Sequence, residues 1–146
     1  NITVTLRPAP SLLSVGYYIT LLQYALEKKL IIKPNLCTEP DFLHPAVLPH
    51  TVKRTYLDKY QKFIDTLECV EVKKDFNASD PYNYQQVIKE QASMIMSILQ
   101  SPAPPNVEHL WEKLVDHCKK WDSVYKQYDA RQLYPELTQI WDRYGY

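Results

Sequence analysis

The sequence predicts an all-α fold: a compact bundle or orthogonal array of five helices with a short extended arm at the N-terminus. Three observations lead to this prediction. The chain of 146 residues is 45% hydrophobic, which is enough to build the core of a single helical domain spanning residues 1–146. It contains only two glycines, too few for a loop-rich or β-rich fold. Apolar residues recur at intervals of three and four between clusters of proline, which is the period of amphipathic helices.

The arm is expected at residues 1–10, because Ile2, Val4 and Leu6 alternate with polar residues before prolines interrupt the pattern. Apolar groups in so short an arm must be covered by something, either within the chain or in a partner. A strand-like segment at 69–73 is one candidate to pair with the arm, although the frayed end of a helix also explains that segment.

The first two helices are expected at residues 11–30 and 50–68. The first starts at Ser11, a plausible N-cap, and its most apolar run is shorter than the roughly 20 residues that a membrane span needs. We therefore predict a buried helix and no membrane partner. Between the two helices, four prolines at 33–49 exclude continuous helix and leave a connector with one short turn. The second helix is amphipathic, with apolar residues on one face and charged residues on the other.

Two further helices are expected at 80–100 and 135–144. Asp80 and Pro81 combine a side-chain cap with a proline at the first helical position, which is a strong start signal. The Pro-Ala-Pro-Pro stretch at 102–105 then separates the 80–100 helix from the next one by a length too short for a domain linker. Those two helices should therefore form a hairpin or a corner.

The helix expected at 106–128, with Asn106 as its N-cap, has the strongest apolar pattern in the chain. Its seam repeats with alternating spacings of four and three residues, and Leu110, Val115 and Val124 widen it. We therefore expect the whole seam to be buried between several neighbours. The seam consists of Val107, Trp111, Leu114, Cys118, Trp121, Tyr125 and Tyr128.

Composition narrows the classes of partner and the compartment. Basic and acidic residues balance at 17 each, so no global field steers the chain toward nucleic acid or anionic lipid. Two glycines cannot build a phosphate-binding loop, so no cofactor is expected. Cys37, Cys69 and Cys118 are odd in number and widely spaced, which favours reduced thiols and an intracellular location, nuclear or cytoplasmic. Glycosylation sequons at Asn1 and Asn77 point the other way, but such matches are close to chance.

No metal or catalytic site is expected. Four thiol and imidazole groups could in principle ligate zinc, but their spacings of seven, six and nineteen residues match no compact zinc knuckle. These residues are Cys37, His44, His50 and Cys69. Cys118 follows His117, yet consecutive helical residues point about 100° apart, which makes the two a poor nucleophile and base. The chain is therefore predicted not to be an enzyme and to have no small-molecule substrate.

The 12 tyrosines and 3 tryptophans are the unusual part of the composition. Rings on apolar stripes are expected in the core; these are Tyr60, Tyr84, Trp111, Trp121 and Tyr125. Rings outside the stripes are candidates for an interface, because large aromatic side chains dominate binding hot spots. The predicted partner-binding set combines the C-terminal aromatics, including Trp141 of the last helix, with Tyr18 and the arm; its members are Tyr134, Trp141, Tyr144, Tyr146, Tyr18, Ile2, Val4 and Leu6.

These observations favour a non-enzymatic protein-protein interaction domain, an adaptor or scaffold module of a larger intracellular regulatory protein. It would bind a peptide or helix of a partner protein in a groove between helices, and could also self-associate through the 106–128 helix. One alternative is a nucleic-acid-binding domain that uses a basic helix face formed by Lys53, Arg54, Lys59 and Lys62. A second alternative is a small helical enzyme with a site assembled from distant residues such as Asp116, His117 and Tyr125.

Overall fold

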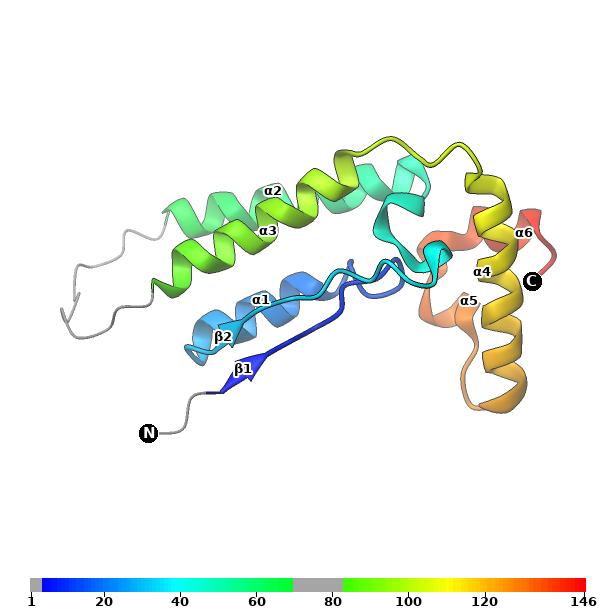
Figure 1. The fold of residues 1–146 in the computed structure, drawn as a ribbon, viewed down its shortest axis with the longest axis horizontal. Helices are drawn as coiled ribbons and strands as arrows, with labels where there is room; N and C mark the ends of the chain where they lie inside the picture. The colour runs from blue at the N-terminus through cyan, green and yellow to red at the C-terminus, as the bar shows by residue number, and fades with distance from the viewer. Residues whose placement is uncertain (1–3, 70–82) are drawn as a thin grey trace.

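The computed structural model describes residues 4–69 and 83–146, and it confirms the all-α class. In this described part, six α-helices accompany one sheet of two short strands. Helices α1, α2 and α3 run along the long axis of the molecule, whereas α4 crosses them at one end with α5 and α6 beside it (Figure 1). The helices are α1 (Tyr18–Glu27), α2 (His50–Cys69), α3 (Tyr84–Gln100), α4 (Val107–Val124), α5 (Ala130–Leu133) and α6 (Thr138–Arg143).

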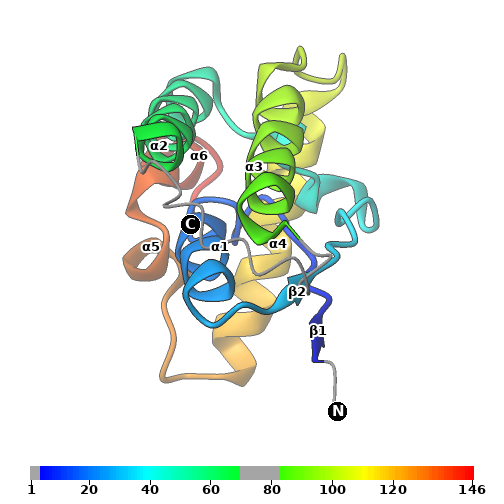
Figure 2. The ribbon, with the colours of Figure 1, turned by 90° about the vertical axis from the view of Figure 1, so that its left-hand side faces the viewer.

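Helices α2 and α3 lie side by side, and α1 packs below them (Figure 2). The buried stripe of α3 has the predicted helical spacing, and each large apolar residue in it contributes about 1.5 to 3 kcal/mol to folding. It consists of Ile88, Ala92, Ile95 and Leu99. Asn83 caps α3 by accepting a hydrogen bond from the amide of Gln86 at 3.0 Å. The predicted start at Asp80 and Pro81 lies outside the described residues, as do both sequons.

Helix α1 is shorter than the predicted range 11–30. Regular helix begins only at Tyr18, because the residues before it form turns that bring Gly16 against the ring of Tyr56. A Cβ atom added to Gly16 would lie 2.6 Å from that ring, so the chain needs glycine at this close approach. At the other end, Lys29 adopts a left-handed conformation with φ 52° and terminates the helix.

The N-terminal arm pairs within the chain. Strand β1 (Thr5–Leu6) lies parallel to β2 (Ile31–Ile32), and three backbone hydrogen bonds of 2.9 to 3.1 Å extend the pairing from residues 33–37 to residues 6–10. The arm therefore uses the segment that follows α1. Most of the other candidate partner, 69–73, lies outside the described residues.

The proline-rich connector contains two 3-10 turns rather than one, η1 (Asp41–Leu43) and η2 (Pro45–Val47). Helix α4 packs against both turns. The indole nitrogen of Trp111 donates a hydrogen bond to the carbonyl of Val47 at 2.8 Å, which attaches α4 to the second turn. The connector thus forms the surface that covers the first half of α4.

Helices α3 and α4 meet at a corner, which settles the choice that the sequence left open (Figure 1). Asn106 occupies the predicted N-cap of α4 but makes no side-chain cap hydrogen bond, and the helix ends at Val124 rather than at residue 128. Helix α5 was not predicted; the side chain of Asp129 caps it. The predicted helix 135–144 is a 3-10 turn, η3 (Pro135–Leu137), followed by α6.

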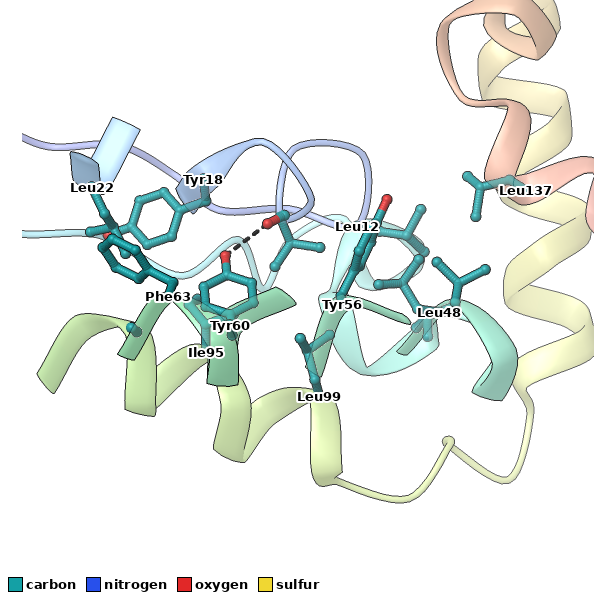
Figure 3. Packing of buried hydrophobic residues seen from close by; sticks show 14 of the residues in the cluster. Leu12, Tyr18, Leu22, Leu48, Tyr56, Tyr60, Phe63, Ile95, Leu99 and Leu137 are labelled. Carbon is teal, nitrogen blue, oxygen red and sulfur yellow. Dashed lines mark hydrogen bonds between the residues drawn. The ribbon is translucent and has the colours of Figure 1, made fainter. Parts of the chain in front are cut away.

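A single cluster of buried apolar side chains joins the N-terminal and C-terminal helices. Tyr60 of α2 is fully buried in it, and its hydroxyl donates to the carbonyl of Val15 at 2.8 Å (Figure 3). Cys118 of α4 and Trp141 of α6 belong to the same cluster. The position of α4 is therefore set by shared core packing of its buried residues between Leu110 and Cys118.

Candidate functional site

The predicted C-terminal aromatic residues pack onto the molecule itself. Trp141 is only 2% exposed, and its indole nitrogen donates to the carbonyl of Tyr134 at 3.0 Å. The ring centroid of Tyr146 lies 5.1 Å from that of Trp141, and its hydroxyl donates to the carboxylate of Asp122. Tyr144 also packs against the core. Trp141 is therefore not available to a partner, and the three tyrosines are only partly exposed.

The remaining predicted contact residues are also mostly engaged. Tyr18 is buried in the core, because it falls on the inner face of α1. Leu6 is half-buried in the pairing with β2, Val4 is exposed, and Ile2 lies outside the described residues. Since the arm is bound in cis, its contribution to a partner surface is small. Most of the predicted partner-binding residues are therefore occupied within the chain.

The last two turns of α4 and the residues after it expose apolar side chains that we expected to be buried. Trp121 is 55% exposed, Val124 70%, Tyr125 48% and Tyr128 50%. The assignment of Trp121 and Tyr125 to the core was therefore wrong. In contrast, Leu114, one heptad before Trp121, is fully buried as predicted.

Four rings line up along this exposed side and form what we call the aromatic ladder. The ring centroids of Phe42 and His117 are 5.2 Å apart, those of His117 and Trp121 6.1 Å, and those of Trp121 and Tyr125 5.2 Å. Phe42 belongs to η1, so the ladder runs from the connector to the end of α4. Val124 and Tyr128 lie at its far end in sequence, and we call the ladder with these two residues the ladder surface.

The ladder is exposed because the end of α4 turns a different side toward the molecule. Val115 and Cys118 are buried, and one turn later Asp122 accepts a hydrogen bond from the amide of Ala130 at 3.0 Å. Consecutive helical residues point about 100° apart, so Trp121 points away from that contact. The chain after α4 thus covers the Asp122 side and leaves the Trp121 side open.

A signal for this exposure was present in the sequence. In the first half of α4, apolar Leu110 and Val115 flank the seam and make it wide enough for a buried helix. One heptad later, the positions equivalent to Leu110 and Val115 are the polar residues His117 and Asp122. A stripe that narrows in this way lacks the width that burial between several neighbours requires.

A second surface is a hollow between α1 and α2. Its larger part has a volume of about 780 Å³ and is lined by apolar groups of Ile19, Leu26, Phe63 and Leu67. A smaller hollow of about 390 Å³ reaches toward the first turn of α2 and shares Gly16, Tyr17 and Lys59 with the larger one. We call the two together the α1–α2 groove.

The four basic residues predicted to form a nucleic-acid patch do not share a face. Lys53 is only 5% exposed, its ammonium donates to the carbonyl of Ser101 at 2.8 Å, and burial lowers its pKa. Arg54 lines a hollow beside Lys53, near the end of α3. Lys59 and Lys62 instead line the α1–α2 groove. The single basic face assumed for nucleic acid is therefore not formed, because Lys53 is buried on the side of α2 opposite to Lys62.

The residues considered for catalysis do not assemble. Burial, with a smaller contribution from Asp122, raises the pKa of the Cys118 thiol to about 12, so the thiol stays protonated near neutral pH. Burial lowers the pKa of His117, whose ring contacts Phe42 and Trp121. Within the described part of the chain, no hydrogen bond joins His117 to Asp116 or Tyr125, and no three metal-ligating side chains converge.

Comparison of the chain with protein-family models, with curated proteins and with solved structures finds no match. None of the described helices combines the length and apolar character that crossing a bilayer requires.

Proposed function

We propose that the chain is a non-enzymatic protein-interaction domain that holds an apolar segment of another protein against the ladder surface. The observation that supports this most directly is the exposure of Trp121, Val124, Tyr125 and Tyr128 near one helix end. Exposed apolar patches on soluble domains commonly mark interaction sites, and tryptophan and tyrosine are enriched among residues that dominate binding energy.

The size of the surface favours a partner segment over a second copy of the chain. A half-exposed tryptophan or tyrosine offers about 100 Å² of additional burial, so the four exposed side chains together offer about 400 Å². Two facing copies would bury about 800 Å² in total, which is below the roughly 1,200 Å² at the lower end of stable interfaces. A partner that wraps around the ridge of α4 can bury more.

An adaptor role inside the cell is consistent with the thiols. Cys37 and Cys118 are both free, and small extracellular domains of this size more often pair their cysteines. The proposal places the domain in an intracellular regulatory assembly, with the partner contacting α4.

The test is site-specific photo-crosslinking in cells, in the full-length protein. A photoreactive phenylalanine analogue replaces Trp121 in one variant and the exposed Tyr24 of α1 in the control. We expect a discrete adduct to a second protein from position 121 and not from position 24. The same protein should be lost from affinity purification of Trp121→Ser/Tyr125→Ser and retained by Tyr24→Ser.

Two outcomes would reject the proposal. An adduct that contains only a second copy of this chain, together with a mass that rises with concentration, would assign the surface to self-association. Identical adducts and identical purified partners for both positions would show that the ladder surface has no specific partner.

A further inference from the structure

The α1–α2 groove is a second candidate docking site, and it shares no residue with the ladder surface. Its floor is formed by inward-facing residues of α2, Phe63 and Leu67, and by Ile19 and Leu26 of α1. α3 packs against both helices from the other side and supports the floor (Figure 2). A firm, apolar trough between two helices is the kind of site that receives the apolar face of a third helix.

The dimensions of the groove fit a helix of about four turns. Along α2 the lining extends from Thr51 to Leu67, which at 1.5 Å per residue is about 24 Å. A partner helix of about 16 residues covers that length. Gly16, Tyr17 and Lys59 lie in the part shared by both hollows.

The rim of the larger part of the groove carries two lysines and one carboxylate. Lys59 and Lys62 line it from α2, and neither forms an ion pair with the residues that the structure describes. That carboxylate, Glu27, is already paired with a lysine, whereas the acidic side chain of Glu136 lines only the smaller hollow. Glu27 pairs with Lys28 at 2.6 Å, and Glu136 accepts a hydrogen bond from the hydroxyl of Tyr56 at 2.5 Å.

We propose that the α1–α2 groove binds an acidic amphipathic helix of another protein. Its apolar residues, spaced three and four apart, occupy the trough, and Glu or Asp residues along one edge face Lys59 and Lys62. Charge complementarity selects the acidic partner, and the trough selects a helix. A nucleic acid would leave the apolar floor unused and would find only two cations.

The proposal is tested by selection from a library of 16-residue amphipathic helices whose apolar face is constant. The edge positions vary among Glu, Gln and Lys, and the bait is the whole chain. We expect Glu to be enriched at the edge positions. Affinity of the selected peptides should fall about tenfold or more for Lys59→Glu/Lys62→Glu, and should weaken as salt is added.

The controls separate the groove from other surfaces. Lys119→Glu/Lys120→Glu on α4 changes the same charges elsewhere and should leave binding unchanged. Thr66→Trp fills the larger hollow from an exposed position without altering charge, and should abolish binding. Trp121→Ser/Tyr125→Ser should have no effect, so failure of this proposal and failure of the proposed function are distinguishable. Thermal unfolding of each variant checks that it is folded.

Three results would overturn the inference: enrichment of Gln or Lys at the edge, selected peptides that bind Lys59→Glu/Lys62→Glu as well as the wild type, or peptides that still bind Thr66→Trp. Binding of a single-stranded oligonucleotide at low salt that depends on Lys59 and Lys62, with no peptide selected, would assign the groove to nucleic acid instead.

Discussion

The two halves of α4 have the same apolar period and opposite environments. Leu114 and Trp121 occupy equivalent seam positions one heptad apart, yet Leu114 is fully buried and Trp121 is 55% exposed. The first half packs against η2 through Trp111, and η1 reaches along α4 only as far as His117. Beyond that point the chain after the helix covers only the Asp122 side. Periodicity therefore reports which side of a helix is apolar, and only the tertiary neighbours determine whether that side is covered.

The largest difference between the two halves is expected in stability. Leu114→Ala should lower the free energy of unfolding by about 2 to 5 kcal/mol, because it removes buried methyl groups and leaves a cavity. Trp121→Ala should lower it by about 1 kcal/mol, because the ring is half in solvent and loses only its contacts with His117 and Tyr125. Urea denaturation of both variants measures the difference. Similar losses for the two variants would mean that Trp121 is covered.

A smaller difference in stability is expected between phenylalanine substitutions of Trp111 and Trp121. Trp111→Phe removes the hydrogen bond to the buried carbonyl of Val47 and should cost about 1 to 2 kcal/mol. Trp121→Phe should be close to neutral, since no hydrogen bond of the Trp121 indole is found among the described residues. The same denaturation measurement applies. If Trp111→Phe were neutral as well, the attachment of α4 to η2 would have to be weaker than its geometry indicates.

The three tryptophans also differ in their exposure to solvent, which fluorescence quenching can measure. Trp141 is buried, Trp111 is half-buried and Trp121 is half-exposed. Acrylamide should therefore quench chiefly the emission of Trp121, and Trp121→Phe should remove most of the readily quenched component. Trp141→Phe should leave that component in place, and the reverse pattern would contradict the arrangement of the C-terminal end.

The features that could be predicted from the sequence depend on local patterns. The α3 stripe, the range of α2 and the break before α4 follow from residue spacing and from prolines, which act on their immediate neighbours. The pairing of Leu6 with Ile32 and the late start of α1 depend on residues distant in the chain. The turn at Gly16, for example, is set by the ring of Tyr56.

The candidate site was harder to predict for the same reason. The apolar nature of the Trp121 side was evident from its spacing, but its exposure depends on where the chain runs after Val124. The prediction of a single basic face on α2 was wrong for a simpler reason. Lys53 and Lys62 lie on opposite sides of α2, which the helical period alone could have shown. That Lys59 and Lys62 line one groove while Arg54 lines another hollow depends on the neighbouring helices.

The smallest effect concerns pH and involves His44 of the connector and His117 of the second half of α4. His44 lies between η1 and η2, and its Nδ1 accepts a hydrogen bond from the amide of Ala46 at 3.1 Å. Burial and the charge of Lys53 lower its pKa, while burial and Lys120 lower the pKa of His117. Both folded-state pKa values therefore lie below the ordinary value of about 6.5.

The sign of the pH effect follows from proton linkage. As pH falls through about 6.5, the unfolded chain takes up protons at these histidines before the folded chain does, so stability decreases toward acid. His44→Asn keeps an acceptor for the amide of Ala46 and cannot be protonated, so it should flatten the dependence between about pH 7.5 and 5.5. His117→Gln should flatten it less, because its ring is on the open side of α4. Urea titrations at several pH values measure the slopes, and a slope unchanged by His44→Asn would contradict a neutral capping histidine under the covered half of the helix.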